Sequence, residues 1–69
     1  MPLTMAKIGE ELQVKRVSGS DEERRFLTNL GFTEGAPVVV LSTDGGNLIV
    51  KIRDARVALG KDVAKKIKV

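Results

Sequence analysis

The sequence predicts a mainly β fold: a small, partly open β-barrel of about five short strands, with one α-helix inserted after the first strand. Short apolar segments alternate with turn residues along the chain. Thirteen of the 69 residues are Val or Ile, and these residue types favour strands. One segment also carries a complete helix-start signal. A sheet this short can bury a core and protect its edges by curling into a barrel.

The first predicted strand runs from Glu11 to Val17. Leu12 and Val14 alternate with polar neighbours, as expected of a strand with one buried face. Val17 is out of step with this alternation by one residue, which predicts a bulge near residues 15–16.

The clearest local signal is the start of a helix that we expect over residues 21–30. Ser20 and Glu23 have the spacing of a capping box, in which each side chain bonds the backbone N–H of the other residue. Three acidic residues occupy the first turn, where the helix dipole favours anions. Gly31 is expected to end the helix in the left-handed conformation.

One face of the predicted helix is apolar. It consists of Phe26, Leu27 and Leu30. We expect Leu30 to be the shared contact of this face. Phe32 falls at the position that normally folds back onto the helix, here onto Leu27, so both phenylalanines are expected to be buried.

The second half of the chain predicts strands joined by tight turns. Val38 to Leu41 is a β-branched run behind Pro37, which suits a strand buried on nearly both faces. Thr43 to Asn47 predicts a hairpin, because Asp-Gly readily takes positive φ angles. The remaining expected elements are a strand from Leu48 to Arg53, a turn at Asp54–Ala55, a strand from Val57 to Leu59 and a last strand from Ile67 to Val69.

Two short segments predict single helical turns. The first covers residues 3–7, where the Thr4 hydroxyl can cap the turn. The second covers residues 61–66, after Gly60 breaks the preceding strand. Because no linker, repeat or low-complexity segment divides the chain, we expect residues 1–69 to form a single domain.

The composition excludes most enzyme chemistry. The chain has no Cys and no His, which removes Cys–His pairs, Ser–His–Asp triads, disulfides and imidazole-rich metal sites. Gly60–Lys61 is the only Gly-Lys pair, but Ala55 and Asp62 stand where a phosphate-binding loop needs Gly and Ser or Thr. We therefore expect neither catalysis nor a cofactor.

Charge and hydropathy indicate the surroundings of the protein. The net charge is +3; residues 1–34 contribute −1 and residues 35–69 contribute +4. A basic C-terminal half can meet an acidic partner, although a merely solubilising surface explains the same pattern. The sequence shows neither a signal peptide nor an apolar run near the roughly 20 residues that a membrane span needs. We expect a cytoplasmic protein.

Three segments together resemble one known family. Arg25 to Gly35 resembles the R-x-L-x-x-L-G-F-x-x-G segment of the FeoA family, ferrous iron transport protein A. Leu3 to Gly9 is similar to the L-x-x-L-x-x-G start of that family, and Val57 to Val69 is similar to its I-A-L-x-x-x-x-A-x-x-I-x-V ending. These segments span nearly the whole chain in the family's order. The sequence departs from the family pattern at Ala6, Glu34, Asp54–Ala55 and Gly60.

The resemblance implies an SH3-like barrel and a non-catalytic accessory role in ferrous iron uptake. The implied partner is the FeoB-type membrane iron permease with its GTP-binding domain, which would hold the protein peripherally at the inner face of the cell membrane. FeoA-like domains also occur in iron-dependent repressors, so a regulatory interaction domain stays an alternative. Because no helix-turn-helix precedes the domain in this sequence, we expect the free-standing transport accessory.

Four arginines are the candidate partner contacts: Arg24, Arg25, Arg53 and Arg56. The first two lie on the predicted helix, where an arginine can act as a finger lent to a GTPase. The alternative is ordinary pairing with Asp21 or Glu22 one turn away, which is the interpretation that we favour.

Two other functions remain to be weighed. A basic nucleic-acid-binding barrel would use the C-terminal lysines, but the chain offers only two phenylalanines for base stacking. Those lysines are Lys61, Lys65, Lys66 and Lys68. Direct iron carriage, which the family's name invites, would depend on carboxylates such as Glu10, Glu11 and residues 21–23, whereas iron(II) sites normally draw on imidazole or thiolate. We therefore assign no metal ligand.

Overall fold

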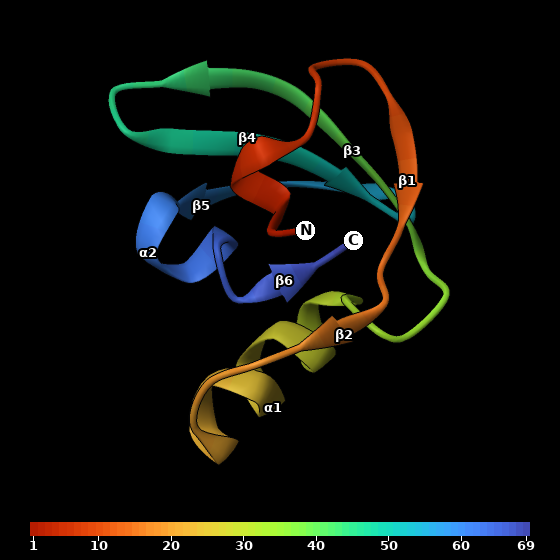
Figure 1. Ribbon diagram of the computed structural model, residues 1–69, viewed down its shortest axis with the longest axis vertical. Coiled ribbons are helices and arrows are strands. Elements are labelled where there is room, and N and C mark those ends of the chain that lie inside the picture. Colours follow the sequence, from red (N-terminus) through yellow and green to blue (C-terminus); the bar gives the residue numbers. More distant parts are fainter.

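The computed structural model describes residues 1–69 and has two antiparallel sheets and one substantial helix (Figure 1). Its elements are η1 (Leu3–Met5), β1 (Glu11–Gln13), β2 (Arg16–Val17), α1 (Asp21–Leu30), β3 (Pro37–Asp44), β4 (Asn47–Ile52), β5 (Ala55–Gly60), α2 (Lys61–Ala64) and β6 (Ile67–Lys68). The strands pair in the order β1-β3-β4-β5 in one sheet and β2-β6 in the other. The sheets do not close on each other, so the predicted partly open barrel is confirmed.

The structure has six strands because the first predicted strand divides in two. The Val14 amide donates to the Ala36 carbonyl oxygen at 3.0 Å, whereas the next amide, from Lys15, donates to the Lys68 carbonyl oxygen at 2.7 Å. The chain therefore leaves the four-stranded sheet after β1 and joins the two-stranded sheet as β2. The expected bulge near residues 15–16 is this change of sheet.

The helix α1 matches its predicted bounds. The Glu23 amide donates to the Ser20 hydroxyl at 3.1 Å, and the Ser20 amide donates to the Glu23 carboxylate at 3.0 Å, which completes the capping box. Gly31 has a φ of 115° at the C-terminal end. The Phe32 amide then donates to the Leu27 carbonyl oxygen at 3.0 Å, so the chain folds back as expected.

The core confirms part of the predicted helix face and corrects the rest. Leu27 and Phe32 are buried, but the Phe26 side chain is 53% exposed, so the prediction that both phenylalanines are buried is wrong. Leu30 is only partly buried. Successive helical residues point about 100° apart, and α1 contacts the barrel through the stripe that contains Leu27, which leaves Phe26 outside.

The hairpins keep their predicted order, with shifted boundaries. β3 continues to Asp44 with a bulge between Val40 and Ser42, and the tight turn is at residues 45–46. The expected turn at Asp54–Ala55 lies one residue earlier, because Ile52 pairs with Ala55 and buries its side chain in the core. β5 then continues to Gly60 before α2 begins.

The two ends of the chain lie side by side (Figure 1). The N-terminal ammonium of Met1 donates to a Val69 oxygen at 2.9 Å, and the Val69 amide donates to the Met1 carbonyl oxygen at 2.8 Å. Pro2 also bridges to Lys68. No helix is long and apolar enough to cross a membrane.

Candidate functional site

The candidate site is a hollow of about 610 Å³ between β2 and α1, which we call the arginine groove. Its lining residues come from β2, one face of α1 and the turn that leads to β3. They are Arg16, Val17, Asp21, Arg24, Arg25, Thr28, Asn29, Phe32, Thr33 and Glu34. Most of these side chains are polar or charged, so the hollow is suited to a polar ligand.

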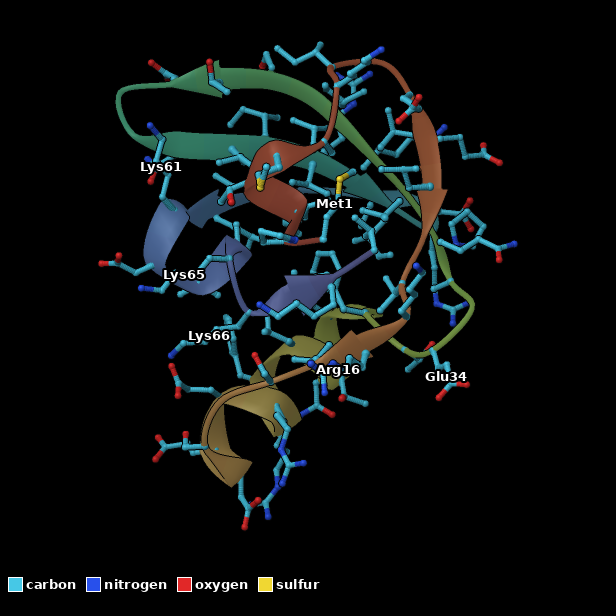
Figure 2. All side chains as sticks on the ribbon, in the orientation of Figure 1. Met1, Arg16, Glu34, Lys61, Lys65 and Lys66 are labelled. Carbon is cyan, nitrogen blue, oxygen red and sulfur yellow. The ribbon has the colours of Figure 1, made fainter.

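The helical repeat explains why α1 presents these residues together. Positions three and four apart share one face of a helix, so Asp21, Arg24, Arg25 and Thr28 form a single stripe. Arg16 reaches the same hollow from β2, which lies across α1 (Figure 2). The capping box fixes where the helix begins and therefore where the stripe faces.

The three arginines of the groove differ in their pairing. Arg24 forms an ion pair with Asp21, as expected for intrahelical spacing, and both side chains are largely exposed. Neither Arg16 nor Arg25 forms an ion pair or a side-chain hydrogen bond within the protein. Two guanidinium groups in the groove are thus free to bind an anion.

Arg53 approaches the groove from the β4–β5 turn. Its guanidinium donates to the Thr33 hydroxyl at 2.7 Å, and Thr33 lines the groove. A Cβ atom on Gly31 would lie 3.3 Å from Arg53 Cδ, so the arginine lies directly over the end of α1. Arg53 also has a φ of 54°, an uncommon conformation for a residue with a side chain. This contact joins the second hairpin to the helix.

Arg56 lies apart from the other three candidate arginines. It pairs directly with Lys51 across β4 and β5, and neither residue forms an ion pair. Like charges directly opposite each other destabilise a sheet. Arg24 and Arg25 thus line the groove, Arg53 borders it through Thr33, and Arg56 lies on the four-stranded sheet.

Sequence reasoning did not single out Arg16. The one feature of the sequence that pointed to Arg16 is the break in strand alternation near residues 15–16. A chain that changes sheets at this point carries the Arg16 side chain to a different surface. That surface faces α1 across the arginine groove, and the pairing of β2 with β6 depends on residues about fifty positions apart. The local sequence thus marks the change of sheet but not the strand with which β2 pairs.

The C-terminal lysines are mostly engaged within the protein. Lys66 forms an ion pair with Glu23, Lys65 lies 3.9 Å from Asp62, and Lys68 Nζ donates to the Lys65 carbonyl oxygen at 2.8 Å. Figure 2 shows Lys61 on α2 and Lys65 directly after it, away from the arginine groove. The lysines therefore do not form one unbroken cationic track.

The exposed Phe26 lies beside a smaller hollow of about 400 Å³, together with Ser20, Glu22, Glu23 and Val63. Its exposure offers the stacking surface that the nucleic-acid alternative needs. Two carboxylates border the same hollow, however, and they would repel a phosphate backbone. Phe26 does not favour that alternative.

Three carboxylates, those of Asp21, Glu23 and Asp62, form ion pairs within the protein, and the acidic residues do not gather as a metal site. No three acidic side chains lie close enough together to hold one ion. A hydrogen bond from Lys66, followed by the backbone and hydroxyl of Ser20, lowers the pKa of Glu23 from 4.5 to about 2. Because it caps α1 and binds Lys66, this carboxylate stays ionised at pH values between 4.5 and about 2, where an ordinary glutamate is mostly protonated.

The two sheets and the single inserted helix define a small SH3-like domain. Within this class, the chain belongs to the FeoA family, because the FeoA domain model matches residues 1–69. The family is associated with ferrous iron transport and is not a known enzyme family.

Individual relatives agree with this assignment. A protein of Methanocaldococcus jannaschii, named as an Fe(2+) transport protein A, is 31% identical over 68 residues, which cover 99% of this chain and 83% of that protein. The structure of Stenotrophomonas maltophilia FeoA complexed with zinc, described as a procaryotic SH3 domain protein, aligns with a TM-score of 0.87 and 27% identity. That alignment covers 99% of this chain and 87% of the other.

A manganese-dependent transcriptional repressor also contains this fold. It aligns with a TM-score of 0.86 and 26% identity, over 97% of this chain and 39% of the repressor. The same small barrel is thus used as one part of a longer regulatory protein.

Proposed function

We propose that this protein is a non-catalytic, cytoplasmic accessory of ferrous iron uptake that docks on a FeoB-type membrane permease and modulates it. The observation that carries this proposal is the match of the FeoA domain to the whole chain. The relative named as an Fe(2+) transport protein supports the same process. The docking surface is made of Arg24, Arg25 and Arg53, with Arg56 contributing charge from the sheet.

The arrangement of the arginines supports a binding role. Arg53 is hydrogen-bonded to Thr33, and Arg24 is paired with Asp21. Paired guanidiniums of this kind are held in place but keep donors exposed, and arginine is enriched at protein interfaces. A surface of this composition favours complementary charge and a fast encounter over chemistry.

The test is a binding titration of the purified protein against the intact permease in detergent or nanodiscs, with GTP hydrolysis measured on the same samples. We expect association and a change in the hydrolysis rate. Arg24→Ala and Arg25→Ala should each change that rate by far less than the roughly 10³-fold that an arginine finger contributes. Absence of binding between the folded protein and the intact permease would refute the proposal.

The repressor likeness supports a second candidate, a regulatory interaction domain. We place it second because that likeness covers less than half of the repressor, whereas the FeoA match covers all of this chain. The two candidates separate in a pull-down from membrane and soluble extracts: recovery of the permease supports transport, and recovery of a DNA-binding protein supports regulation.

A further inference from the structure

The arginine groove has charge that the protein itself does not neutralise. Arg16 and Arg25 line it and form no ion pair. Arg16 also lies directly opposite Lys68 in the β2–β6 pair, an arrangement of like charges that destabilises a sheet. A carboxylate bound beside Arg16 would relieve that repulsion. Binding of an anion in the groove would therefore lower the electrostatic repulsion among these cationic side chains.

The shape and lining of the groove fit a peptide better than a single small ion. α1 has 10 residues and is about 15 Å long, whereas an extended peptide advances about 3.3 Å per residue. A segment of about four or five residues would thus span the helix. Thr28 and Asn29 line the groove and make no side-chain hydrogen bond within the protein, so both can bond a peptide backbone.

The two carboxylates of the groove differ, because Asp21 is neutralised by its ion pair with Arg24 and Glu34 has no such partner. Glu34 lines the groove at the turn before β3 and forms no ion pair, and Figure 2 shows it to one side of Arg16. A bound carboxylate would be repelled near Glu34 and attracted near Arg16 and Arg25. An acidic segment would therefore place its carboxylates over the arginines and its remaining end near Glu34.

A run of phosphates fits this pattern less well. Asp21 and Glu34 both line the groove, so evenly spaced phosphates would meet carboxylates as well as arginines. The two apolar residues of the lining are Val17 and Phe32, and Phe32 is buried, so no exposed aromatic ring offers a surface for base stacking. A peptide can place its few carboxylates where the arginines are.

We infer that the arginine groove is a docking site for a short acidic segment of a protein partner, whose carboxylates pair with Arg16 and Arg25 while Thr28 and Asn29 bond its backbone. The inference rests on the proposed function only in taking the partner to be the permease. The groove itself can be tested with the isolated protein.

The experiment measures fluorescence anisotropy of a labelled peptide, Glu-Asp-Leu-Glu-Asp, titrated with the protein at about 0.01 M and about 0.1 M salt, where the Debye lengths are about 30 Å and about 10 Å. A matched peptide, Gln-Asn-Leu-Gln-Asn, controls for the backbone. Backbone amide NMR shifts locate the peptide. We expect binding of the acidic peptide, weaker at the higher salt, with shifts at residues 16–17 and 24–34.

Charge reversals then test the groove. Arg16→Glu and Arg25→Glu together should weaken peptide binding about tenfold or more. Each arginine reversal made singly is compared with Lys61→Glu, the matched control, which makes the same change of charge at an exposed residue of α2 and should weaken binding by less than about twofold. Arg25→Lys should bind the peptide more tightly than Arg25→Glu but more weakly than the parent protein, since lysine lacks the bidentate fork of arginine. If a reversal prevents folding, Arg16→Gln and Arg25→Gln replace it.

Several results would overturn the inference: equal weakening by Lys61→Glu, amide shifts that fall on α2 instead of α1, no binding of the acidic peptide, or tighter binding of a single-stranded oligonucleotide of equal charge at the same residues. Peptide and permease binding are measured separately. Permease binding that survives the groove reversals would refute this docking site alone, whereas peptide binding without any permease binding would refute the proposed function alone.

Discussion

Lys66 Nζ donates a hydrogen bond to the Glu23 carboxylate and thereby joins the first turn of α1 to the segment that precedes β6, across 43 positions of sequence. The same carboxylate accepts from the Ser20 amide. Glu23 thus serves a local and a long-range purpose at once. It caps the helix and fixes the helix against the two-stranded sheet, which places the arginine groove.

This pair makes stability depend on pH. Because the pKa of Glu23 falls from 4.5 to about 2 on folding, its contribution is complete above about pH 4.5 and is lost as the pH falls toward 2. We expect Glu23→Gln to lower the melting temperature at pH 7 and to have a much smaller effect near pH 2. Melting curves of the parent protein and of Glu23→Gln, measured between pH 2 and pH 7, test this expectation. A difference that does not change with pH would contradict this role of Glu23, and added salt should reduce the difference because the pair is partly exposed.

The two leucines of α1 should differ in their effect on stability. Leu27 is fully buried and Leu30 is only partly buried. We expect Leu27→Ala to cost about 2–5 kcal/mol, and Leu30→Ala about 1–2 kcal/mol. In a domain of marginal stability the first change should largely unfold the protein. Urea unfolding of both variants measures the two costs, and an equal or reversed order would show that α1 packs through a different face.

Gly31 should resist substitution by any residue with a side chain. Its φ of 115° is strained for such residues, and a new Cβ would lie within 3.4 Å of Ile52 and Arg53 atoms. We expect Gly31→Ala to destabilise the protein by about 1–3 kcal/mol. Gly60→Ala is the control, since Gly60 has an ordinary φ of −63° and a new Cβ there would make only an ordinary contact, 3.7 Å from Asn47 Oδ1. It should be neutral or slightly stabilising, and a comparable loss there would contradict the conformational explanation.

The purified protein should bind ferrous iron only weakly. Its potential ligands are carboxylates alone, because the chain has no His or Cys. Asp21 and Glu23 are moreover engaged in ion pairs. We expect anaerobic calorimetry to find affinities no tighter than those of scattered surface carboxylates. One-to-one binding at micromolar or tighter affinity would contradict the expectation.

Charge reversal of Arg53 and of Arg56 should have different effects, because Arg53 has a structural contact and Arg56 contributes charge alone. Either reversal to Glu should slow association with the permease, most clearly at low salt. Arg53→Glu should in addition lower stability by about 0.5–1.5 kcal/mol, because it loses the hydrogen bond to Thr33. Arg56→Glu relieves a like-charge pair with Lys51 and should not destabilise the protein. Stopped-flow association and thermal melting of each variant distinguish the two effects.

Local signals predicted the elements whose formation depends on neighbouring residues. The capping box at Ser20 and Glu23 placed the start of α1, and Gly31 placed its end. The predicted strand boundaries were wrong where the boundary depends on the strand with which the segment pairs. The chain changes sheets near Lys15 because Ala36 and Lys68, both distant in sequence, accept the successive amide hydrogen bonds.

The candidate site likewise contains residues that local sequence could predict and one that depends on distant strand pairing. Arg24 and Arg25 could be found from the helix pattern. The pairing of Arg24 with Asp21 could be expected from spacing alone, whereas the pairing that we expected for Arg25 does not form. Arg16 could not be found in this way, since it joins them only through the pairing of β2 with β6. The exposure of Phe26 also went unforeseen, because apolar residues at positions 26, 27 and 30 do not by themselves show which of them faces the barrel.

By itself, the sequence determined the mainly β character, the helix and its caps, the order of the hairpins and the family, because each depends on short-range periodicity, backbone conformational preference or an ordered set of motifs. Only the tertiary structure decided which side chains share a surface: it brought Arg16 to Arg25, placed Arg53 over Gly31 and joined Lys66 to Glu23. The reason is physical. Burial and strand pairing are satisfied jointly by residues far apart in the chain, and no local segment carries that information.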